Sequence, residues 1–529
     1  MFVHGLIVCV LPAMLTAEER PVLPRGHVFF ATDFESGDEM KPWTGLAVPG
    51  EGFRSPRALV LERPAHLSAG YASATVELPV SKMRGYVVHF SAMIKAENVS
   101  RKPQPWNGVK FMAPIVTNKD RLWPAADLAA GTFDWQRIAF RALVPEDAKQ
   151  MTLVVGLEAV TGKAWFDDIR VIAWKRLPGD EPAARPGPAY KGHDQPRLRG
   201  AMVSPNIDEE GLRVFGKQWN ANLIRWQLVR TGNVGDPLDL GAYERWLQGA
   251  LKQLDAALPW CEKYGLKVVV DLHSPPGGRI VPGAGYAGSD HGLFTNAACQ
   301  RKFVEVWEHM ARRYKDARTI WGYDLANEPV ESAAGEDLDD WQDLAERTAK
   351  TIRAIDPKRT IIVEPPQWGG PQGLRELRPL SVPNVVYSVH MYLPHAFTHQ
   401  GVHGPGKAYL YPGEIEGKRW DKAQLEAALA PVAEFQRKYG VHIYIGEFSA
   451  IRWAPEGSAC RYLNDLIEIF EARGWDWSYH AFREWDGWSV EHGSDPKDHN
   501  RAKTPTDRQQ LLRSWFNRNA KRAATSSAN

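Results

Sequence analysis

A regular alternation of strand and helix patterns begins near residue 197 and constrains the fold more than any other feature of this sequence. Lys267–His273, for example, reads KVVVDLH, a β-branched run that is typical of a buried parallel strand. The helix before it is predicted from apolar residues at helical spacing between Tyr243 and Leu258, and Gly265 ends it. Eight strand patterns of this kind occur, at 198–203, 221–226, 267–273, 319–327, 360–364, 385–390, 441–447 and 475–480.

These patterns predict a multidomain chain in which an all-β jelly-roll sandwich precedes an α/β domain. Eight strand–helix units over roughly 320 residues predict a (β/α)8 TIM barrel at residues 197–519. A doubly wound sheet is the alternative, but no glycine-rich phosphate loop follows any of the strand patterns. Residues 18–175 instead alternate apolar and polar side chains with a period of two, as at 86–94, which predicts the sandwich. The Pro- and Gly-rich segment 176–196 lacks periodicity and predicts a linker.

The two ends of the chain and its charge indicate where such a protein acts. Residues 1–17 form an apolar run that ends at a small-residue site, which is typical of a signal peptide. We therefore expect a secreted protein, periplasmic or extracellular, and a disordered polar tail at 520–529. The formal net charge is only +2 and the basic residues are scattered, so neither nucleic acid nor a membrane is expected as a partner. A monomer that requires no cofactor is the expectation.

Polar side chains follow the ends of six of the eight predicted strands. In a TIM barrel these positions meet at the C-terminal face, where the active site lies. Glu328 and Glu447 stand on strands four and seven, which lie on opposite walls of the barrel. Desolvation raises the pKa of a carboxyl group, so one of the pair can stay protonated while the other stays ionised, as glycoside hydrolysis requires. The set comprises Arg225, His273, Asn327, Glu328, His390, Tyr392, Glu447 and, after the last strand, Trp485.

Five of these motifs resemble glycoside hydrolase family 5, in order and on the expected strands. Asp324–Pro329 reads DLANEP and resembles the Asn-Glu-Pro signature of that family, and Ile443–Phe448 reads IYIGEF and resembles its Gly-Glu-Phe nucleophile strand. Arg225 is similar to the family's strand-two arginine, His273 to its strand-three histidine, and His390-Met391-Tyr392 to its strand-six His-x-Tyr. The resemblance covers about residues 197–517.

The resemblance implies a retaining hydrolysis of a β-linked glycan, of the endoglucanase or mannanase type. Glu328 would be the acid/base, and Glu447 the nucleophile. Asn327 would bind the sugar 2-hydroxyl, Arg225 would pair with Glu447 and keep it ionised, and Tyr392 would donate a hydrogen bond to Glu447. The same catalytic set serves glucan, mannan, xyloglucan and glycolipid cleavage, so the sequence leaves the glycan open.

The remaining family positions are histidines and an aromatic residue. His273 and His390 would hold sugar hydroxyls or Glu328. In the family, strand eight usually ends with a tryptophan that forms the base of the cleavage subsite. This chain departs from that pattern, because its strand contains His480 and Trp485 follows only five residues later. Of these two, Trp485 is the residue we expect at the subsite.

The first domain resembles the carbohydrate-binding jelly rolls that accompany such enzymes. The resemblance rests on Asp33–Gly37 (DFESG) and Ala164–Ile169 (AWFDDI). It implies a structural calcium ion on Glu35 and Asp168, since Ca²⁺ prefers carboxylate oxygens; plain surface acids are the alternative. The 21 tryptophans of the chain serve either the core or stacking on sugar rings.

Two other functions compete with glycoside hydrolysis. A metal-dependent TIM-barrel hydrolase would use His273, His390, Glu328 and Glu447 as ligands, but no His-x-His motif occurs at the first strand. A non-catalytic carbohydrate-binding scaffold would have lost its chemistry, whereas both glutamates are present here.

Overall fold

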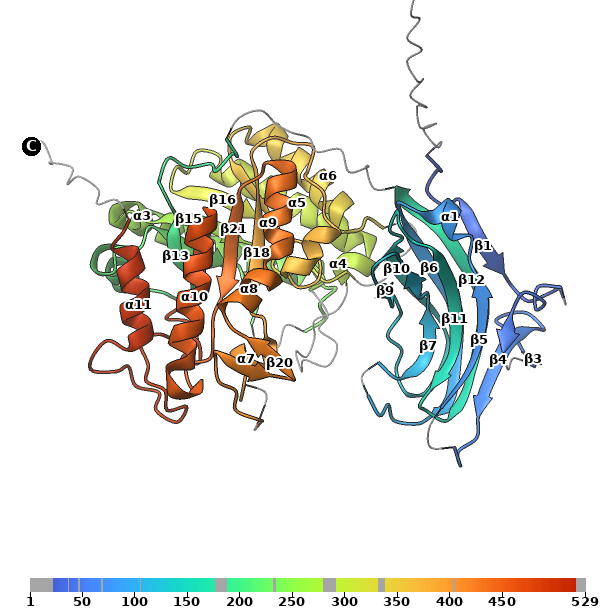
Figure 1. The fold of residues 1–529 in the computed structure, drawn as a ribbon. Coiled ribbons are helices and arrows are strands. Elements are labelled where there is room, and N and C mark those ends of the chain that lie inside the picture. The colour runs from blue at the N-terminus through green and yellow to red at the C-terminus, as the bar shows by residue number, and fades with distance from the viewer. Residues whose placement is uncertain are drawn as a thin grey trace, which may run out of the picture. The chain divides into compact units, whose positions relative to one another are not determined.

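The computed structural model describes residues 22–519 except 37, 46–47, 68–69, 105, 177–187, 232–234, 279–291, 332–337, 403 and 405. The leader predicted at 1–17 and the tail predicted at 520–529 lie outside the described residues. The chain divides into two compact units, with the division between Gly179 and Asp180 (Figure 1). None of the helices described is long and apolar enough to cross a membrane.

The N-terminal unit is a sandwich of two antiparallel sheets, which confirms the predicted all-β fold. The first sheet has the order β10 (Gly131–Leu143), β6 (Tyr86–Val99), β12 (Gly162–Arg176), β4 (Ala58–Arg63), β3 (Val48–Gly50), with β1 (Val28–Thr32) beside β12. The second has the order β2 (Thr44–Gly45), β5 (Tyr71–Glu77), β11 (Gln150–Glu158), β8 (Ile115–Val116), β9 (Arg121–Leu122), with β7 (Gly108–Met112) beside β11. A short helix, α1 (Val80–Met83), precedes β6.

The period-two pattern explains how these sheets share a core. Alternate residues of β6 point to the same face of the sheet, and that face is apolar. Phe90 of β6 stacks on Phe140 of β10 with ring centroids 4.5 Å apart. Phe111 of β7, in the other sheet, meets Phe140 edge-on at 5.2 Å. The aromatic contacts therefore join the two sheets into one core.

The C-terminal unit is a closed barrel of eight parallel strands, as the sequence predicts. In order around the barrel the strands are β13 (Arg199–Val203), β14 (Leu223–Gln227), β15 (Lys267–Asp271), β16 (Ile320–Asp324), β17 (Thr360–Val363), β18 (Val385–Met391), β21 (Ile443–Phe448) and β22 (Asp476–Phe482). A hairpin of β19 (Gly413–Ile415) and β20 (Lys418–Trp420) lies between β18 and β21 in the chain. The strands are buried on both faces, which accounts for their continuous apolar runs.

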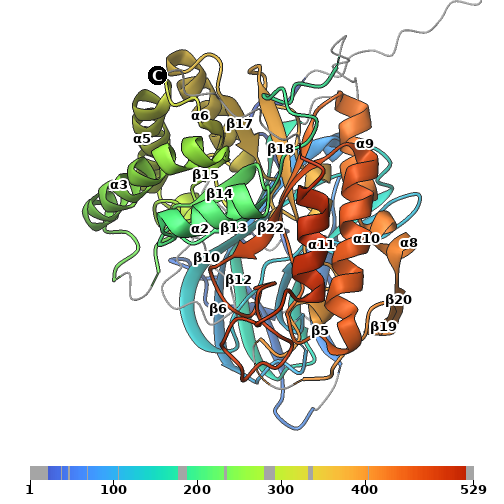
Figure 2. The same ribbon diagram turned by 90° about the vertical axis from the view of Figure 1, so that its left-hand side faces the viewer.

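Helices lie outside the barrel strands (Figure 2). The longest, α3, carries the predicted apolar stripe on its buried side. The side chain of Asp239 caps its first turn by accepting from the Ala242 N–H, and Gly265 ends it at φ 81°, a conformation that favours glycine. The α-helices of this unit are α2 (Glu209–Arg213), α3 (Leu240–Tyr264), α4 (Gly292–Thr295), α5 (Ala297–Tyr314), α6 (Trp341–Ile355), α7 (His395–Thr398), α8 (Lys422–Ala428), α9 (Ala430–Tyr439), α10 (Ser458–Arg473) and α11 (Asp507–Phe516).

The second half of the predicted linker packs against the barrel. The Tyr190 hydroxyl lies 3.1 Å from Thr360 Oγ1, at the start of β17. His193 Nε2 lies 2.7 Å from Asp476 Oδ2, at the start of β22, and both side chains are buried. Both strands begin at the N-terminal face of the barrel, so residues 188–196 cover that face. The barrel unit therefore extends upstream of the predicted boundary at residue 197.

Candidate active site

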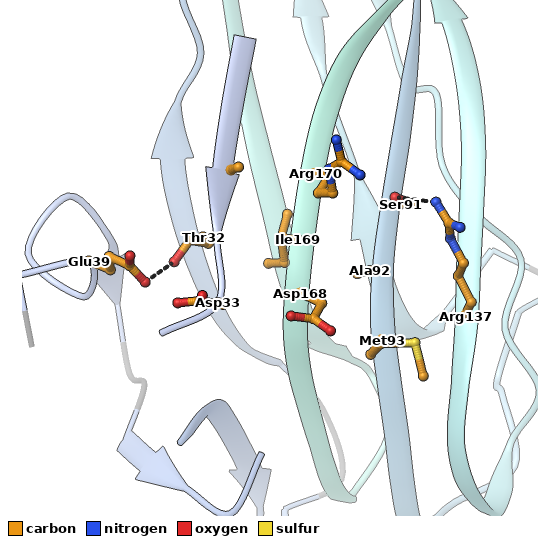
Figure 3. A pocket seen from close by; sticks show the side chains of 11 residues that line it. Thr32, Asp33, Glu39, Ser91, Ala92, Met93, Arg137, Asp168, Ile169 and Arg170 are labelled. Carbon is orange, nitrogen blue, oxygen red and sulfur yellow. Dashed lines mark hydrogen bonds between the residues drawn. The ribbon is translucent and has the colours of Figure 1, made fainter. Parts of the chain in front are cut away.

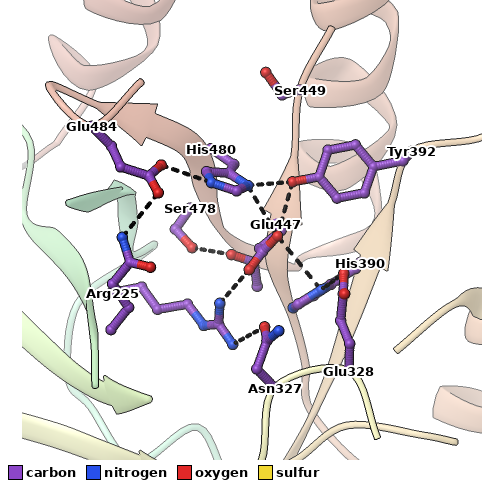
Figure 4. Close-up of polar contacts among 12 residues, drawn as sticks. Arg225, Asn327, Glu328, His390, Tyr392, Glu447, Ser449, Ser478, His480 and Glu484 are labelled. Atoms are coloured by element: carbon purple, nitrogen blue, oxygen red, sulfur yellow. Dashed lines mark hydrogen bonds and ion pairs between the residues drawn. The ribbon is translucent and has the colours of Figure 1, made fainter. Parts of the chain in front are cut away.

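Two glutamates approach each other at the C-terminal face of the barrel. Glu447 lies within β21 and is 3% exposed, and Glu328 lies four residues after the end of β16. One oxygen of each carboxylate and one nitrogen of His390 lie within 4.8 Å of one another. Figure 4 shows Glu447 at the centre, with Arg225, Tyr392, His390 and His480 pointing toward it. The strand ends therefore bring together the two carboxylates that the sequence singles out.

Arg225 on β14 holds one oxygen of Glu447. Its Nη1 donates to Glu447 Oε1 at 2.5 Å, and the guanidinium is fully buried. Its other nitrogens donate to Asp324 Oδ2 at 3.0 Å, Glu364 Oε1 at 2.8 Å and Asn327 Oδ1 at 3.2 Å. Burial lowers the pKa of Arg225, but the carboxylates around it raise that pKa well above the ordinary value. Arg225 is thus a permanent cation that pairs with several carboxylates.

Tyr392 and His480 hold the other oxygen of Glu447. The Tyr392 hydroxyl donates to Glu447 Oε2 at 2.8 Å, and His480 Nδ1 lies 3.0 Å from the same atom. His480 also contacts the Tyr392 hydroxyl, and its Nε2 lies 2.9 Å from Glu484 Oε2. Gln227 Nε2 in turn donates to Glu484 Oε1 at 3.1 Å. This chain of contacts fixes the imidazole against the carboxylate.

The surrounding cations set the protonation state of Glu447. Burial alone would raise its pKa, but the charges of His390 and His480, together with Arg225, hold the pKa of Glu447 well below the ordinary value. Burial lowers the pKa of His480, whereas Glu447 and Glu484 raise it, and the result is a pKa of about 10. Glu447 is therefore an anion at neutral pH, as a nucleophile must be.

The second glutamate, Glu328, has a strained backbone and a histidine partner. Its φ of 43° lies in the left-handed region that non-glycine residues rarely adopt. His390 Nδ1 lies 2.9 Å from Glu328 Oε1, and the Glu328 N–H donates to Glu364 Oε2 at 2.7 Å. The Glu328 side chain is 15% exposed, so it is more accessible than Glu447.

His273 and Asn327 form a separate pair beside the glutamates. His273 Nδ1 lies 2.9 Å from Asp271 Oδ2, and its Nε2 lies 3.4 Å from the Asn327 side-chain nitrogen. Because Asn327 Oδ1 accepts from Arg225, its amide nitrogen points toward His273. His273 thus holds Asn327, while His390 is the histidine that contacts Glu328.

The structure describes both residues that the sequence offers at the end of strand eight. The sequence favours Trp485 at the subsite, and His480 is the residue of β22 that lies against Glu447. Strand β22 runs to Phe482, so Trp485 falls in the following turn and is 39% exposed. Its ring packs 5.4 Å from Trp488, whose ring lies 6.0 Å from those of Tyr392 and His480. Trp488 is therefore the indole next to Tyr392 and His480.

Sequence reasoning missed three residues of this site. Glu364 directly follows β17, so the strand-end rule that selects Glu328 also selects Glu364 when it is applied to the fifth strand. Glu484 and Trp488 lie in the turn after β22, and no pattern in the sequence marks them. The site thus contains more ionisable groups than the motifs indicate.

The geometry of His390 bears on the metal-hydrolase alternative. Its Nδ1 faces Glu328 at 2.9 Å and its Nε2 faces Glu364 Oε1 at 3.1 Å. Burial lowers the pKa of His390, but the charges of Glu364 and Glu447 raise it well above the ordinary value. A charged imidazole carries a proton on both nitrogens and offers no lone pair to a metal. The donor set therefore fits an ion-pair network better than a metal site.

The sandwich contains a cavity of about 500 Å³ near the predicted acidic residues (Figure 3). Asp168 lies in its wall, and burial, followed by the charges of Asp33 and Glu35, raises the pKa of Asp168. The Glu35 N–H donates to Asp33 Oδ1 at 3.1 Å. The cavity is lined by Ala31, Thr32, Asp33, Glu39, Ser91, Ala92, Met93, Arg137, Asp168, Ile169 and Arg170. Asp33 and Asp168 thus line this cavity, whereas Glu35 is not among its lining residues, although its charge contributes to the raised pKa of Asp168.

Comparison with known proteins places this site in a family. Endoglucanase C of Acetivibrio thermocellus is 30% identical over 269 residues, which cover 46% of this chain and 75% of that protein. Cellodextrinase A of Ruminococcus flavefaciens is 26% identical over 242 residues, covering 45% of this chain and 69% of that protein. The crystal structure of endoglucanase Cel5A from Thermotoga maritima aligns with a TM-score of 0.45 and 26% identity, over 59% of this chain and 96% of that one.

A family model accounts for the barrel directly. Residues 191–484, which are more than half of the chain, match the model of the cellulases of glycosyl hydrolase family 5. The matched residues include both glutamates and the strand-end side chains around them. Because this match and the relatives agree, the chain is a glycoside hydrolase and belongs to glycosyl hydrolase family 5.

Proposed function

We propose that this enzyme cleaves internal bonds of a β-linked glucan with retention of configuration, using Glu447 as nucleophile and Glu328 as acid/base. The observation that carries the proposal is the close approach of the two carboxylates, whose nearest oxygens lie within 4.8 Å of each other. Retaining glycosidases hold their carboxyl groups about 5–5.5 Å apart, whereas inverting enzymes leave about 6.5–9.5 Å for a water molecule. A distance of at most 4.8 Å between the nearest oxygens supports the retaining geometry.

The side chains support a double displacement. In the first step Glu447 attacks the anomeric carbon, while Glu328 gives its proton to the departing glycosidic oxygen. In the second step Glu328, now ionised, removes a proton from a water molecule that displaces Glu447 from the sugar. Asn327, held between Arg225 and His273, is placed to bind the sugar 2-hydroxyl.

The relatives favour a glucan over other β-linked glycans. Two of them are named as an endoglucanase and a cellodextrinase. Trp368 and Trp485, which follow strands β17 and β22, are 37% and 39% exposed, and such indoles stack on the faces of sugar rings. We therefore expect turnover of β-glucan and its oligosaccharides, with mannan and xyloglucan as the rival substrates in the same assay.

The test combines a substrate panel with the stereochemistry of the product. We expect reducing ends to appear within soluble β-glucan chains, and proton NMR of the first product should show the β-anomer. Glu447→Ala should abolish turnover while the protein still binds the glycan. Initial release of the α-anomer, or full activity of Glu447→Ala, would refute the assignment.

We propose that the sandwich binds the glycan chain. Tyr71, Trp106 and Trp123, which belong to the second sheet and its connections, are 77%, 67% and 58% exposed. Aromatic side chains on a sheet suit the flat faces of a neutral polysaccharide. In a Glu447→Ala background, Trp106→Ala and Trp123→Ala should weaken retention on insoluble cellulose. Leu67→Ala, at an aliphatic position that is 41% exposed, is the control and should bind normally.

Calcium binding by the sandwich is a further proposal. Glu35 and Asp168, with Asp33 beside them, would supply the oxygen ligands, and the repulsion among these carboxylates would be relieved by the cation. Calcium should raise the unfolding temperature and a chelator should reverse the rise. If Asp168→Asn responds to calcium as the unaltered protein does, these residues are not the ligands.

Secretion is also a proposal, which rests on the apolar run at residues 1–17. Expression of the complete chain in a bacterial host should yield a mature protein outside the cytoplasm, shortened near residue 17. N-terminal sequencing of the recovered protein decides this, because an intact Met1 on exported protein would contradict cleavage.

A further inference from the structure

Glu364 is a buried carboxylate that the catalytic roles above do not use. It directly follows β17 and its side chain is 0% exposed. The backbone of Glu364 is also held in place, because the Trp341 indole N–H donates to the Glu364 carbonyl at 2.7 Å. A charge without access to solvent is costly unless its neighbours compensate it. The partners of Glu364 therefore indicate what the residue does.

The side chain of Glu364 meets three groups of the catalytic apparatus. Its Oε2 accepts from the backbone N–H of Glu328 at 2.7 Å. Its Oε1 lies 2.8 Å from Arg225 Nη2 and 3.1 Å from His390 Nε2. One carboxylate thus contacts the backbone of the acid/base, its histidine partner, and the arginine that pairs with Glu447.

The contact with the Glu328 backbone explains how that residue keeps its conformation. At φ 43° the Glu328 backbone is strained, and such strain persists only where the surroundings hold it. An ionised acceptor makes a stronger hydrogen bond to an N–H than a neutral one does. Glu364 therefore fixes the direction in which the Glu328 side chain leaves the barrel.

The contact with His390 fixes the other side of Glu328. The imidazole lies between two carboxylates, with Nδ1 at 2.9 Å from Glu328 Oε1 and Nε2 at 3.1 Å from Glu364 Oε1. A carboxylate at one ring nitrogen keeps a proton there and sets the ring orientation. The atom that His390 presents to Glu328 thus depends on Glu364.

We propose that Glu364 is a positioning residue for the acid/base, which orients Glu328 through its backbone N–H and through His390 so that its proton faces the leaving oxygen. The inference rests on the proposed function of Glu328. The charge of Glu364 also contributes to the raised pKa of His390, together with Glu447 and a hydrogen bond to Glu328. Glu364 does not itself make or break a bond. Its replacement should therefore resemble, in weaker form, the loss of Glu328 as the acid.

The experiment compares Glu364→Gln and Glu364→Ala with a matched control, Asp324→Asn. Asp324 is also fully buried and accepts from the same guanidinium, through Nε at 3.0 Å. Glutamine removes the charge but keeps an oxygen for the Glu328 N–H, and alanine removes both. The measured quantity is kcat/KM, which reports the departure of the leaving group and not the later attack of water, on a series of β-glycosides whose leaving groups differ in pKa.

A misplaced acid should matter most where the leaving group needs its proton. We expect Glu364→Gln to lower kcat/KM about 10- to 100-fold on poor leaving groups and only a few-fold on activated aryl glycosides. Glu364→Ala should show a steeper dependence on the leaving group. Asp324→Asn should lower kcat/KM by the same factor on all of them. A uniform loss in Glu364→Gln, or none, would overturn the proposal.

Two further measurements distinguish a failure of the positioning role from a failure of the proposed function. Glu328→Ala in the same series tests the proposed function: if it shows no leaving-group dependence, the acid assignment fails. If Glu328→Ala shows this dependence on the leaving group and Glu364→Gln does not, only the positioning role of Glu364 fails. Should the variants not fold, ¹⁵N NMR of the His390 ring in the unaltered protein decides, because the proposal requires a proton on Nε2 at neutral pH and is refuted by an unprotonated Nε2.

Discussion

Replacing His480 by glutamine should move the acid limb of the pH–rate profile toward higher pH. His480 Nδ1 lies 3.0 Å from Glu447 Oε2, and its pKa of about 10 keeps it charged throughout the acid range. Glu447 must be ionised to attack, so kcat/KM falls as the pH drops through the pKa of Glu447 in the free enzyme. Removing a cation raises that pKa, which is why the limb moves upward.

The size of the shift follows from the geometry. Two unit charges 3.0 Å apart interact by about 5 kcal/mol at an effective dielectric constant of 20, and one pKa unit corresponds to about 1.4 kcal/mol, so the upper bound is nearly 4 units. Arg225 and His390 remain in place, and the glutamine amide can still donate to Glu447. An opposite charge at this range typically shifts a carboxyl pKa by about 1–3 units, and we expect about 1–2 here.

The assay is kcat/KM against pH on an activated aryl glycoside, which depends little on protonation by Glu328. His273→Gln is the matched control, because His273 is a histidine of the same barrel face that contacts Asp271 and Asn327. Its acid limb should stay where it is in the unaltered enzyme. An unmoved limb in His480→Gln, or one displaced to lower pH, would show that His480 does not help to keep Glu447 ionised.

Three further outcomes are expected. Glu328→Ala should lose about 10²- to 10⁴-fold in kcat/KM on poor leaving groups and much less on activated aryl glycosides, and equal losses would contradict its acid role. Because the folded state raises the pKa of His480 to about 10, its contribution to stability should be complete below about pH 6.5 and disappear as the pH rises through 10. Urea unfolding of His480→Gln beside the unaltered protein should show a difference that shrinks over this window, and a constant difference would refute it. A chain that begins at residue 188 should fold and cleave short substrates, whereas one that begins at 194 lacks the His193–Asp476 contact and should melt at a lower temperature; equal melting temperatures would mean that the segment adds no stability.

The barrel could be predicted because each of its strands is buried on both faces. Continuous β-branched runs such as Val268–Val270 are typical of strands buried on both faces, and their repetition predicts the number and order of the strands. Strand ends are less certain. The pattern at 319–327 extends past the observed strand, Ile320–Asp324, because the apolar residues Leu325 and Ala326 are buried outside the sheet. Buried apolar residues look the same in the sequence whether they lie within the strand or just beyond its end.

The strand-end rule places Glu328 and Glu447 at one face but does not determine which side chain of strand eight lies beside them. Side chains alternate along a strand, so an error of a few residues in its end changes which side chain points into the barrel mouth. The sequence allows β22 to end at His480 or to continue toward Trp485, and the structure ends it at Phe482. Because the family usually has a tryptophan at this position, the sequence favours Trp485 over the polar His480.

The protonation states of the site depend on distances that no sequence pattern carries. The sequence motif implies only that Glu447 is buried. By itself, burial would raise the pKa of the Glu447 carboxyl and favour its protonated form. The family resemblance supplies Arg225 as one compensating cation. The other two, His390 and His480, are cations because each is held by a second carboxylate, Glu364 for the first and Glu484 for the second. Since Glu364 directly follows β17 and Glu484 lies in the turn after β22, the charge balance that keeps Glu447 ionised appears only once the barrel has closed.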